Sequence, residues 1–465
     1  MPDYQRLVLD EAHHLESVAI DCLTWRLDRI ALNRLLARIH SDQHPERSRL
    51  ALIAKDLSPN SKLTSALQVE LPAMKRNLTL ESDKAFDALI PLRGSGDKCR
   101  INSVANLPVQ EFKELRESLK RFAFELTHIE SVLLESDKEA FQSDALELHS
   151  VASKLEKMAH GIEQFFSDKE KQVRWLEFSS SSATLVMAPL DISEYLRDHL
   201  FHTKRTTTLC SATLSTNQNF QFLRSKLGLT GERKTIAEAI FDSPFDFANR
   251  SLLLIPKDIP EPNHPSFISV ASEKVLQALQ ISQGNAFVLF TSYDMLRKCY
   301  EQVTACAPNR FHYLRQGDAP RNKLIEQFKS RDGSVLFGTD SFWEGVDVAG
   351  EALRCVILMK LPFRVPDDPR AQAYAEHLQK EGKDPFNDDA LPHAVVKFKQ
   401  GFGRLMRKKN DRGCVLCLDV RLATKGYGKT FLKSLPNCKK LSANSSEIFA
   451  EMADFYDRTA ICNPL

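Results

Sequence analysis

Residues 335–347 read Val-Leu-Phe-Gly-Thr-Asp-Ser-Phe-Trp-Glu-Gly-Val-Asp. The apolar run Val335 to Gly338 has the length and residue types of a buried strand, and polar residues follow it at once. On either side, similar runs alternate with helical periodicity. The expected strands are 286–291, 311–314, 355–358 and 415–419, and the expected helices are 293–304, 321–329 and 392–408. This alternation predicts an α/β fold with parallel sheets covered on both faces.

The first half of the chain has a different pattern. Residues 6–10, 184–187 and 206–210 predict further buried strands, which we expect to share one parallel sheet. Between them, residues 41–175 predict helices with little strand character. In 111–135, for example, apolar residues recur every three or four positions among charged ones, which is typical of amphipathic helices.

Composition excludes several protein classes. The chain has 465 residues, 43% hydrophobic and 27% charged, which is ordinary globular usage and enough for two to four domains. No apolar run approaches the ~20 residues of a membrane span, and the first residues lack the apolar core of a signal peptide. We therefore expect a cytoplasmic protein without a membrane partner. A net charge of +2 neither supports nor excludes nucleic-acid binding.

Two polar segments follow expected strands. Asp10-Glu11-Ala12-His13 comes after the first strand. Adjacent carboxylates there suit a nucleoside triphosphatase, in which one holds Mg²⁺ and the next orients the attacking water. Acids that complement a helix N-terminus explain the tetrapeptide as well. Ser211-Ala212-Thr213 places two hydroxyls after the strand 206–210.

The expected helix 392–408 carries a polar face. Gln400, Arg404 and Arg407 are three or four residues apart, so we expect all three side chains on one side of this helix. Arginine stabilises the charge that develops in phosphoryl transfer. Solvated surface cations are the alternative for each residue alone, but they do not explain the whole set of segments.

Together these segments resemble the DinG/XPD-type superfamily 2 DNA helicases, especially the bacterial DinG branch. Asp10 to His13 resembles the family's motif II, Ser211 to Thr213 motif III, and Phe290 to Ser292 motif IV. Ser341 to Asp347 resembles motif V, and Gln400 to Arg407 motif VI. The resemblance extends from residue 5 to about 436 and is weakest over 41–175.

The resemblance implies a domain organisation. Residues 1–40 and 176–248 would form a truncated first RecA-like domain, and 249–465 would form the second. The helical region 41–175 would be the insertion called the arch, under which single-stranded DNA threads.

It also implies residue roles. Asp10 would bind Mg²⁺ through water, and Glu11 would be the catalytic base. His13, Ser211, Thr213 and Glu344 would couple hydrolysis to DNA movement. The remaining predicted residues are Gly338 and Asp347 at the nucleotide cleft, Gln400, Arg404 and Arg407 at the γ-phosphate of ATP, and Phe342 and Trp343 as DNA-stacking aromatics or, alternatively, core residues.

Two parts of the family pattern are not found in these residues. A Walker A loop ending in Gly-Lys-Thr should precede motif II, which here stands at residue 10. The cysteines that bind an iron–sulfur cluster in many members belong to that same stretch. Gly428-Lys429-Thr430 has Ala423 where a Walker A loop needs glycine, so we do not expect a phosphate loop there.

We therefore expect a DinG-like ATP-dependent DNA helicase polypeptide that uses ATP and Mg²⁺ and acts in DNA repair or replication. The 5′ to 3′ polarity is only implied by the family. One alternative is an inactive nucleic-acid-binding remnant. Another is a C-terminal subunit that needs a separately encoded half with Walker A. A nuclease is a weaker alternative, because the exonuclease domain of some relatives is not found in these residues.

Overall fold

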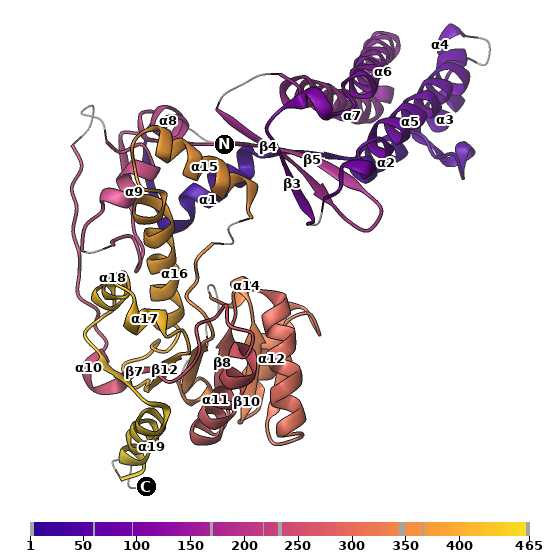
Figure 1. The fold of residues 1–465 in the computed structure, drawn as a ribbon. Coiled ribbons are helices and arrows are strands. Elements are labelled where there is room, and N and C mark those ends of the chain that lie inside the picture. The colour runs from indigo at the N-terminus through magenta and orange to yellow at the C-terminus, as the bar shows by residue number, and fades with distance from the viewer. Residues whose placement is uncertain are drawn as a thin grey trace. The chain divides into compact units, whose positions relative to one another are not determined.

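The computed structural model describes residues 4–58, 61–94, 96–167, 171–216, 218–230, 235–343, 348, 350–364 and 367–461. The chain divides into two compact units (Figure 1). Unit 1 comprises Met1–Leu15, Ser193–Val365 and His377–Leu465, and unit 2 comprises Glu16–Ile192 and Pro366–Glu376. None of the described helices is long and apolar enough to cross a membrane.

Unit 1 contains a seven-stranded, wholly parallel sheet in the order β13-β7-β12-β11-β8-β10-β9. The parallel sheet and its helices confirm the predicted α/β class. The strands are β7 (Ser251–Pro256), β8 (Ala286–Leu289), β9 (His312–Arg315), β10 (Ser334–Gly338), β11 (Cys355–Leu358), β12 (Gly413–Cys417) and β13 (Lys439–Ala443).

The helices of unit 1 are listed here with their bounds: α8 (Ser193–Leu196), α9 (Gln221–Lys226), α10 (Phe247–Arg250), α11 (Phe267–Ser282), α12 (Tyr293–Cys306), α13 (Arg321–Ser330), α14 (Asp340–Trp343), α16 (Leu391–Gly403), α17 (Arg421–Thr424), α18 (Gly428–Ser434) and α19 (Ser445–Ile461). All of them except α8 and α9 contribute to the cores on the two faces of the sheet, which is why its strands read as continuous apolar runs. Leu253 and Ile255 of β7 pack in one core with α13, α14, α16, α17 and α18. Leu252 and Leu254 pack in the other with α11, α12 and α19.

A separate two-stranded parallel sheet joins β1 (Arg6–Leu9) to β6 (Thr206–Leu209). The predicted parallel pairing of the first strand is thus confirmed. Val8 is nevertheless 68% exposed, whereas parallel strands are ordinarily covered on both faces. The described part of the chain leaves this small sheet open.

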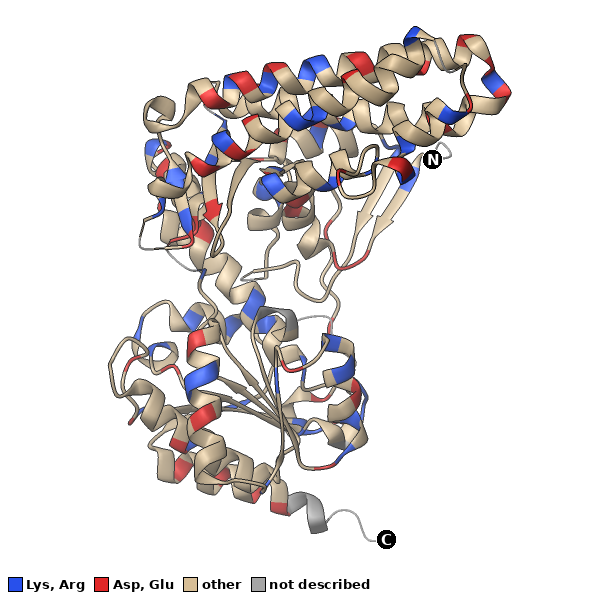
Figure 2. Cartoon of the chain, turned by 90° about the vertical axis from the view of Figure 1, so that its right-hand side faces the viewer, with Lys and Arg blue, Asp and Glu red and all other residues tan. Residues whose placement is uncertain are grey.

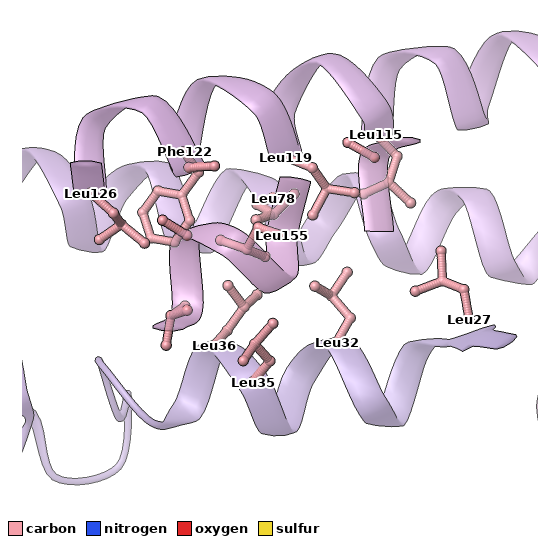
Figure 3. Close-up of a cluster of buried hydrophobic side chains, with 14 of the residues drawn as sticks. Leu27, Leu32, Leu35, Leu36, Leu78, Leu115, Leu119, Phe122, Leu126 and Leu155 are labelled. Carbon is pink, nitrogen blue, oxygen red and sulfur yellow. The ribbon is translucent and has the colours of Figure 1, made fainter. Parts of the chain in front are cut away.

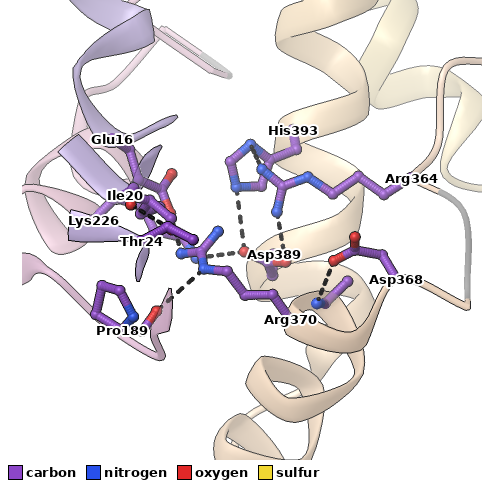
Figure 4. Close-up of polar contacts among 11 residues, drawn as sticks. Glu16, Ile20, Thr24, Pro189, Lys226, Arg364, Asp368, Arg370, Asp389 and His393 are labelled. Atoms are coloured by element: carbon purple, nitrogen blue, oxygen red, sulfur yellow. Dashed lines mark hydrogen bonds and ion pairs between the residues drawn. The ribbon is translucent and has the colours of Figure 1, made fainter. Parts of the chain in front are cut away.

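A buried ion pair connects α9 with the segment that precedes α16. The ammonium of Lys226 contacts Oδ1 of Asp389, and both residues are buried. His393 Nε2 lies 3.3 Å from the same oxygen, and Arg364 Nη1 lies 3.7 Å from Oδ2 (Figure 4). Burial by itself favours the neutral acid, but His393, Lys226 and Arg364 outweigh it and hold the pKa of Asp389 well below its usual range.

Unit 2 is built on an antiparallel sheet in the order β2-β5-β4-β3. Its strands are β2 (Trp25–Asp28), β3 (Lys98–Ile101), β4 (Gln172–Phe178) and β5 (Ala183–Pro189). Its helices are α1 (Leu15–Leu23, whose first residue falls in unit 1), α2 (Arg29–Ala37), α3 (Arg49–Lys55), α4 (Lys62–Ser65), α5 (Leu71–Asp87), α6 (Val109–Ser136) and α7 (Lys138–Phe165). One leucine-rich core joins α2, α3, α5, α6 and α7 to β2, and its side chains point toward one another (Figure 3).

Unit 2 also takes in residues 366–376, which stand between the strands β11 and β12 in the sequence. They include the start of α15 (Pro369–Lys380), where Ala373 packs against the sheet residues Val173 and Trp175. Arg100 of β3 donates to both carboxylate oxygens of Glu376, at 2.6 and 2.7 Å. Arg370 lies 3.5 Å from the carboxylate of Glu16 (Figure 4). The sequence did not predict that residues 366–376 would join unit 2.

Two sequence expectations about unit 2 are wrong. The region 41–175 contains β3 and the start of β4. Residues 184–187 lie in β5 of the antiparallel sheet and not beside β1. The tight turn from Ser179 to Ser182, closed by a 2.9 Å backbone hydrogen bond, folds β5 back on β4. The three-part domain division stays a prediction, and the two compact units cut across it.

We predict that Asp389→Asn destabilises the fold by ~3–5 kcal/mol at about pH 7, because it leaves the buried ammonium of Lys226 uncompensated. The pKa of Asp389 is depressed in the folded state. Its contribution is therefore present above the unfolded value, about 3.9, and is lost as the pH falls below it. Urea unfolding across this pH range measures both effects.

Asp388→Asn is the matched control, because Asp388 is exposed. An equal loss of stability in the two variants, or a difference between them that does not shrink as the pH falls below about 3.9, would contradict the role of the buried carboxylate.

Candidate functional site

The acidic turn and the hydroxyl turn meet because β1 and β6 are parallel, so that their carboxyl ends lie at one edge. Cys210 N donates to Leu9 O at 3.0 Å, and Ala12 N donates to Cys210 O at 3.1 Å. Between these bonds Glu11 adopts φ 49° and ψ 41°, a left-handed conformation that is uncommon outside glycine. The pairing places Asp10 and Glu11 beside Ser211.

The hydroxyl of Ser211 joins the two predicted motifs. It donates to Glu11 Oε2 at 2.9 Å and lies 2.7 Å from His13 Nδ1. A carboxylate can only accept, so the hydroxyl proton points at Glu11 and His13 must donate from Nδ1. Thr213 N also donates to Ser211 Oγ, at 3.2 Å. Of the predicted residues, Glu11, His13, Ser211 and Thr213 are therefore brought together.

Exposure differs within this cluster. The side chain of Glu11 is 63% exposed, whereas that of His13 is 10% exposed. Asp10 is exposed, and its Oδ1 accepts from Glu11 N at 2.9 Å. Partial desolvation, together with the neighbouring carboxylate of Asp10, raises the pKa of the Cys210 thiol. The site thus presents two carboxylates to solvent, and the side chains of His13 and Ser211 support them through hydrogen bonds.

A second cluster forms around Trp343 in the larger sheet. Its Nε1 donates to the carbonyl of Phe290 at 3.0 Å, and its own carbonyl accepts from Arg404 Nε at 2.8 Å. Gly401 of α16 lies against the indole, since a Cβ there would come within 2.9 Å of the ring. Phe290, Trp343 and the pair Gly401 and Arg404 belong to three segments that the sequence singled out separately, and they meet at Trp343.

Phe342 and Trp343 are core residues and not DNA-stacking aromatics. Both are 0% exposed and belong to the core of the parallel sheet. The short helix α14 turns the chain at the end of β10 and directs both rings inward. The ring of Phe342 packs over Gly338, where a Cβ would approach it to 2.7 Å. The core alternative weighed for these two residues is the correct one.

The predicted common face of Gln400, Arg404 and Arg407 is wrong in its geometry. The helix α16 ends at Gly403, because Asp411 Oδ2 accepts from the backbone N–H groups of Arg407 and Lys408, both at 2.7 Å, and holds the chain in a loop. Arg404 is 8% exposed and faces inward. Arg407 is exposed.

Three predicted residues contribute no described side chain. Glu344 and Asp347 lie outside the described residues. Gly338 ends β10, and its carbonyl accepts from Phe290 N at 2.9 Å. Gly338 therefore acts through its lack of a side chain, which makes room for Phe342.

The sequence missed two polar residues near these clusters. Gln316, just after β9, accepts through Oε1 from the backbone N–H of Thr339 at 2.6 Å and from its hydroxyl at 3.0 Å. Lys399 of α16 donates to the carbonyl of Ser215 at 3.1 Å, and burial lowers its pKa. Position directly after a strand was the only available signal for Gln316. Lys399 carried none, because lysine is common on helices.

Comparisons with known proteins agree with these motifs. The model of a helicase C-terminal domain matches residues 275–438. DinG of Bacillus subtilis (strain 168), named a 3′-5′ exonuclease, is 30% identical over 483 residues, which cover 97% of this chain and 51% of that protein. The ATP-dependent DNA helicase YoaA of Haemophilus influenzae is 38% identical over 266 residues, covering 57% of this chain and 41% of the relative.

A solved XPD helicase shares the fold. It aligns with a TM-score of 0.55 and 16% identity, and the alignment covers 94% of this chain and 68% of the XPD chain. The sequence comparisons support a relationship to the DinG/XPD-type helicases of superfamily 2. The chain spans about half the length of the curated relatives it matches, at 51% of DinG and 41% of YoaA.

The donor set of this chain fits a hydrated magnesium nucleotide. Magnesium keeps several waters and is usually held by one or two carboxylates plus phosphate oxygens. Asp10 offers such an exposed carboxylate at the end of β1. No cluster of three or more potential metal ligands is found among the described residues. The geometry thus suits magnesium that arrives with a nucleotide.

We predict that Trp343→Phe destabilises unit 1 by ~1–3 kcal/mol, because the carbonyl of Phe290 loses its donor inside the core. Urea unfolding of the whole chain measures the loss. Phe241→Leu is the control, since Phe241 is 89% exposed and should change stability by less than ~0.5 kcal/mol. Unchanged stability of the Trp343 variant would show that the indole N–H is dispensable to the contact among the three segments.

Proposed function

We propose that this chain carries the motif II to motif VI portion of a DinG-like helicase, which couples ATP hydrolysis to movement along single-stranded DNA and to unwinding, with 5′ to 3′ polarity and in DNA repair or replication. The contact that carries the proposal is the hydrogen bond from Ser211 to Glu11, reinforced by His13. It ties the carboxylate predicted to act on water to the segment predicted to sense DNA.

In this proposal Asp10 orients magnesium through water, and Glu11 orients and deprotonates the attacking water. The 63% exposure of Glu11 gives a water room beside its carboxylate. When Glu11 accepts the proton of that water, its charge is neutralised and its hold on the Ser211 hydroxyl weakens. Ser211, His13 and Thr213 are then placed to pass this change into the segment that follows β6.

The phosphate side of the proposal rests on Gln400, Arg404 and Arg407. Gln400 is 8% exposed, and its Nε2 has no hydrogen-bond partner among the described residues. Buried polar atoms without partners are rare and costly, so a ligand oxygen is a natural acceptor. Arg404 is held in one direction by its bond to Trp343 O. An arginine positioned in this way can stabilise charge on a transferring phosphoryl group.

A second contact supports coupling between hydrolysis and movement. Lys399, next to Gln400, donates to Ser215, two residues after Thr213. In this proposal, a movement of Gln400 is transmitted through Lys399 and its hydrogen bond with Ser215 to the segment that follows motif III. We place Gly338 and Asp347 at the nucleotide cleft, and Glu344 among the residues that couple hydrolysis to DNA movement, as the family implies.

The alternative of a subunit completed by another polypeptide segment also has an observation in its favour. The sheet of β1 and β6 has two strands, and Val8 is 68% exposed. Phe241 and Ile240 are 89% and 53% exposed in the extended segment before α10. Further strands with a phosphate-binding loop, whether from the same or from a separate polypeptide, would cover this sheet and supply the phosphate contacts.

We predict that Glu11→Gln lowers DNA-stimulated ATP hydrolysis by about 10²–10⁴-fold, the usual contribution of a general base, while single-stranded DNA binding is unchanged. The assay uses this chain together with a Walker A-bearing segment, and the chain by itself in parallel. Glu326→Gln, on the exposed surface of α13, is the control. Equal turnover of the Glu11 variant would remove Glu11 from the reaction.

The parallel assay also separates the alternatives. Turnover that requires the added segment supports a completed subunit. Turnover by the 465 residues alone shows that they are self-sufficient. DNA binding without turnover in either assay favours the remnant.

A further inference from the structure

A groove in unit 2 combines an aromatic floor with cations on both sides. It has a volume of about 410 Å³, within the range of ~300–1,000 Å³ that is common for ligand sites. It runs between α2 and α7, and its floor includes Trp25 of β2, Leu35 of α2 and Met158 of α7. None of the predicted helicase residues lies in it.

Trp25 is held in a fixed position on this floor. A Cβ on Gly161 would approach the indole to 2.0 Å, so the ring rests directly on the backbone of α7. The ring of Phe165, one turn further along α7, lies 6.3 Å from it between centroids. The indole is nevertheless only half-buried, which leaves part of its surface facing the groove.

Four cations line the groove. Arg34 and Arg38 stand one turn apart on α2, and Lys154 and Lys157 stand one turn apart on α7. Arg38 is neutralised by Glu147, to which it donates two hydrogen bonds of 3.0 and 2.9 Å. Arg34, Lys154 and Lys157 have no carboxylate partner among the described residues. The groove therefore holds three uncompensated positive charges.

This local excess differs from the rest of the unit. Figure 2 shows Lys and Arg interspersed with Asp and Glu along the helices, and several cations are paired, such as Arg29 with Asp87 and Arg49 with Asp144. The whole chain has a net charge of only +2. The excess of positive charge is thus local to the groove and does not belong to a generally positive surface.

We propose that this groove is an accessory site for single-stranded DNA, in which one base stacks on Trp25 and the flanking phosphates contact Arg34, Lys154 and Lys157. An aromatic platform beside cations is the combination that binds unpaired strands without sequence preference. A duplex offers no exposed base face to the indole. The inference rests on the proposed function, because it takes single-stranded DNA as the ligand of this chain.

The three tryptophans of the chain provide the readout. Trp175 and Trp343 are 6% and 0% exposed, so Trp25 is the one whose emission a bound base can quench. Short oligo(dT) is titrated into the whole chain, with tryptophan emission reporting this groove and the anisotropy of a labelled oligo(dT) reporting total binding. We expect quenching that saturates with oligo(dT) and weakens with salt.

The Arg34→Glu/Lys157→Glu double variant should weaken quenching at least ~10-fold in affinity, because two phosphate contacts become repulsive. Lys113→Glu/Lys138→Glu is the matched control on α6 and α7, since both lysines are exposed and lie outside the groove. Trp25→Phe should keep total binding and abolish quenching, because phenylalanine still stacks. This conservative variant guards against loss of folding.

The outcomes separate this site from the proposed function. If oligo(dT) binds but neither quenches Trp25 nor responds to the double variant, the accessory site is overturned and the proposed function stands. If oligo(dT) does not bind at all, both are contradicted. Equal quenching by duplex DNA or by poly-glutamate would overturn the assignment to single strands, because it would show a general polyanion groove.

Discussion

Burial of Trp343 is the constraint on which the larger part of the candidate site depends. Its indole N–H satisfies the carbonyl of Phe290, and its carbonyl fixes Arg404. Gly401 allows α16 to approach the ring closely. An isolated buried indole N–H would cost ~1–3 kcal/mol, so the hydrogen bond and the packing are required together. The positions of three polar segments therefore follow from one apolar side chain.

The first cluster follows from a different constraint, which is strand direction. Because β1 and β6 are parallel, the polar segments that follow them lie at the same edge of the sheet. Ser211 and Glu11 are nevertheless 200 residues apart in the chain. Parallel strand pairing thus positions Glu11 and Ser211, just as burial of Trp343 positions Arg404. Both constraints operate before any nucleotide or DNA is present.

The sequence was informative where one residue pattern has one structural solution. Strands such as 286–289 and 355–358 are buried on both faces, so their apolar runs were continuous and could be recognised. The acidic and hydroxyl turns were found because they directly follow strands that the sequence predicts, although β1 and β6 are themselves partly exposed. The fold class and the pairing of these two turns were therefore predictable.

Long-range partners decided the rest. The strand 183–189 is apolar like its parallel counterparts, and only the turn at Ser179 assigns it to an antiparallel sheet. Phe342 and Trp343 have the chemistry of stacking residues, yet α14 directs them inward. The end of α16 depends on Asp411, which accepts from Arg407 and Lys408 across the loop. None of these outcomes is encoded within a single periodic segment.

Two local costs lie where function is proposed. Glu11 holds a left-handed backbone conformation, which costs ~1–3 kcal/mol for such a residue, and Gln400 buries an amide nitrogen without a described partner. Two other left-handed residues have evident structural reasons: Gln283 ends α11, and the Asn285 side chain accepts from Gly333 N at 2.8 Å. Glu11 gains no comparable bond from its own side chain to the backbone, since its carboxylate accepts from Ser211 instead. Costs of this kind are expected at functional sites, where a local rule is broken for the sake of an interaction with a ligand.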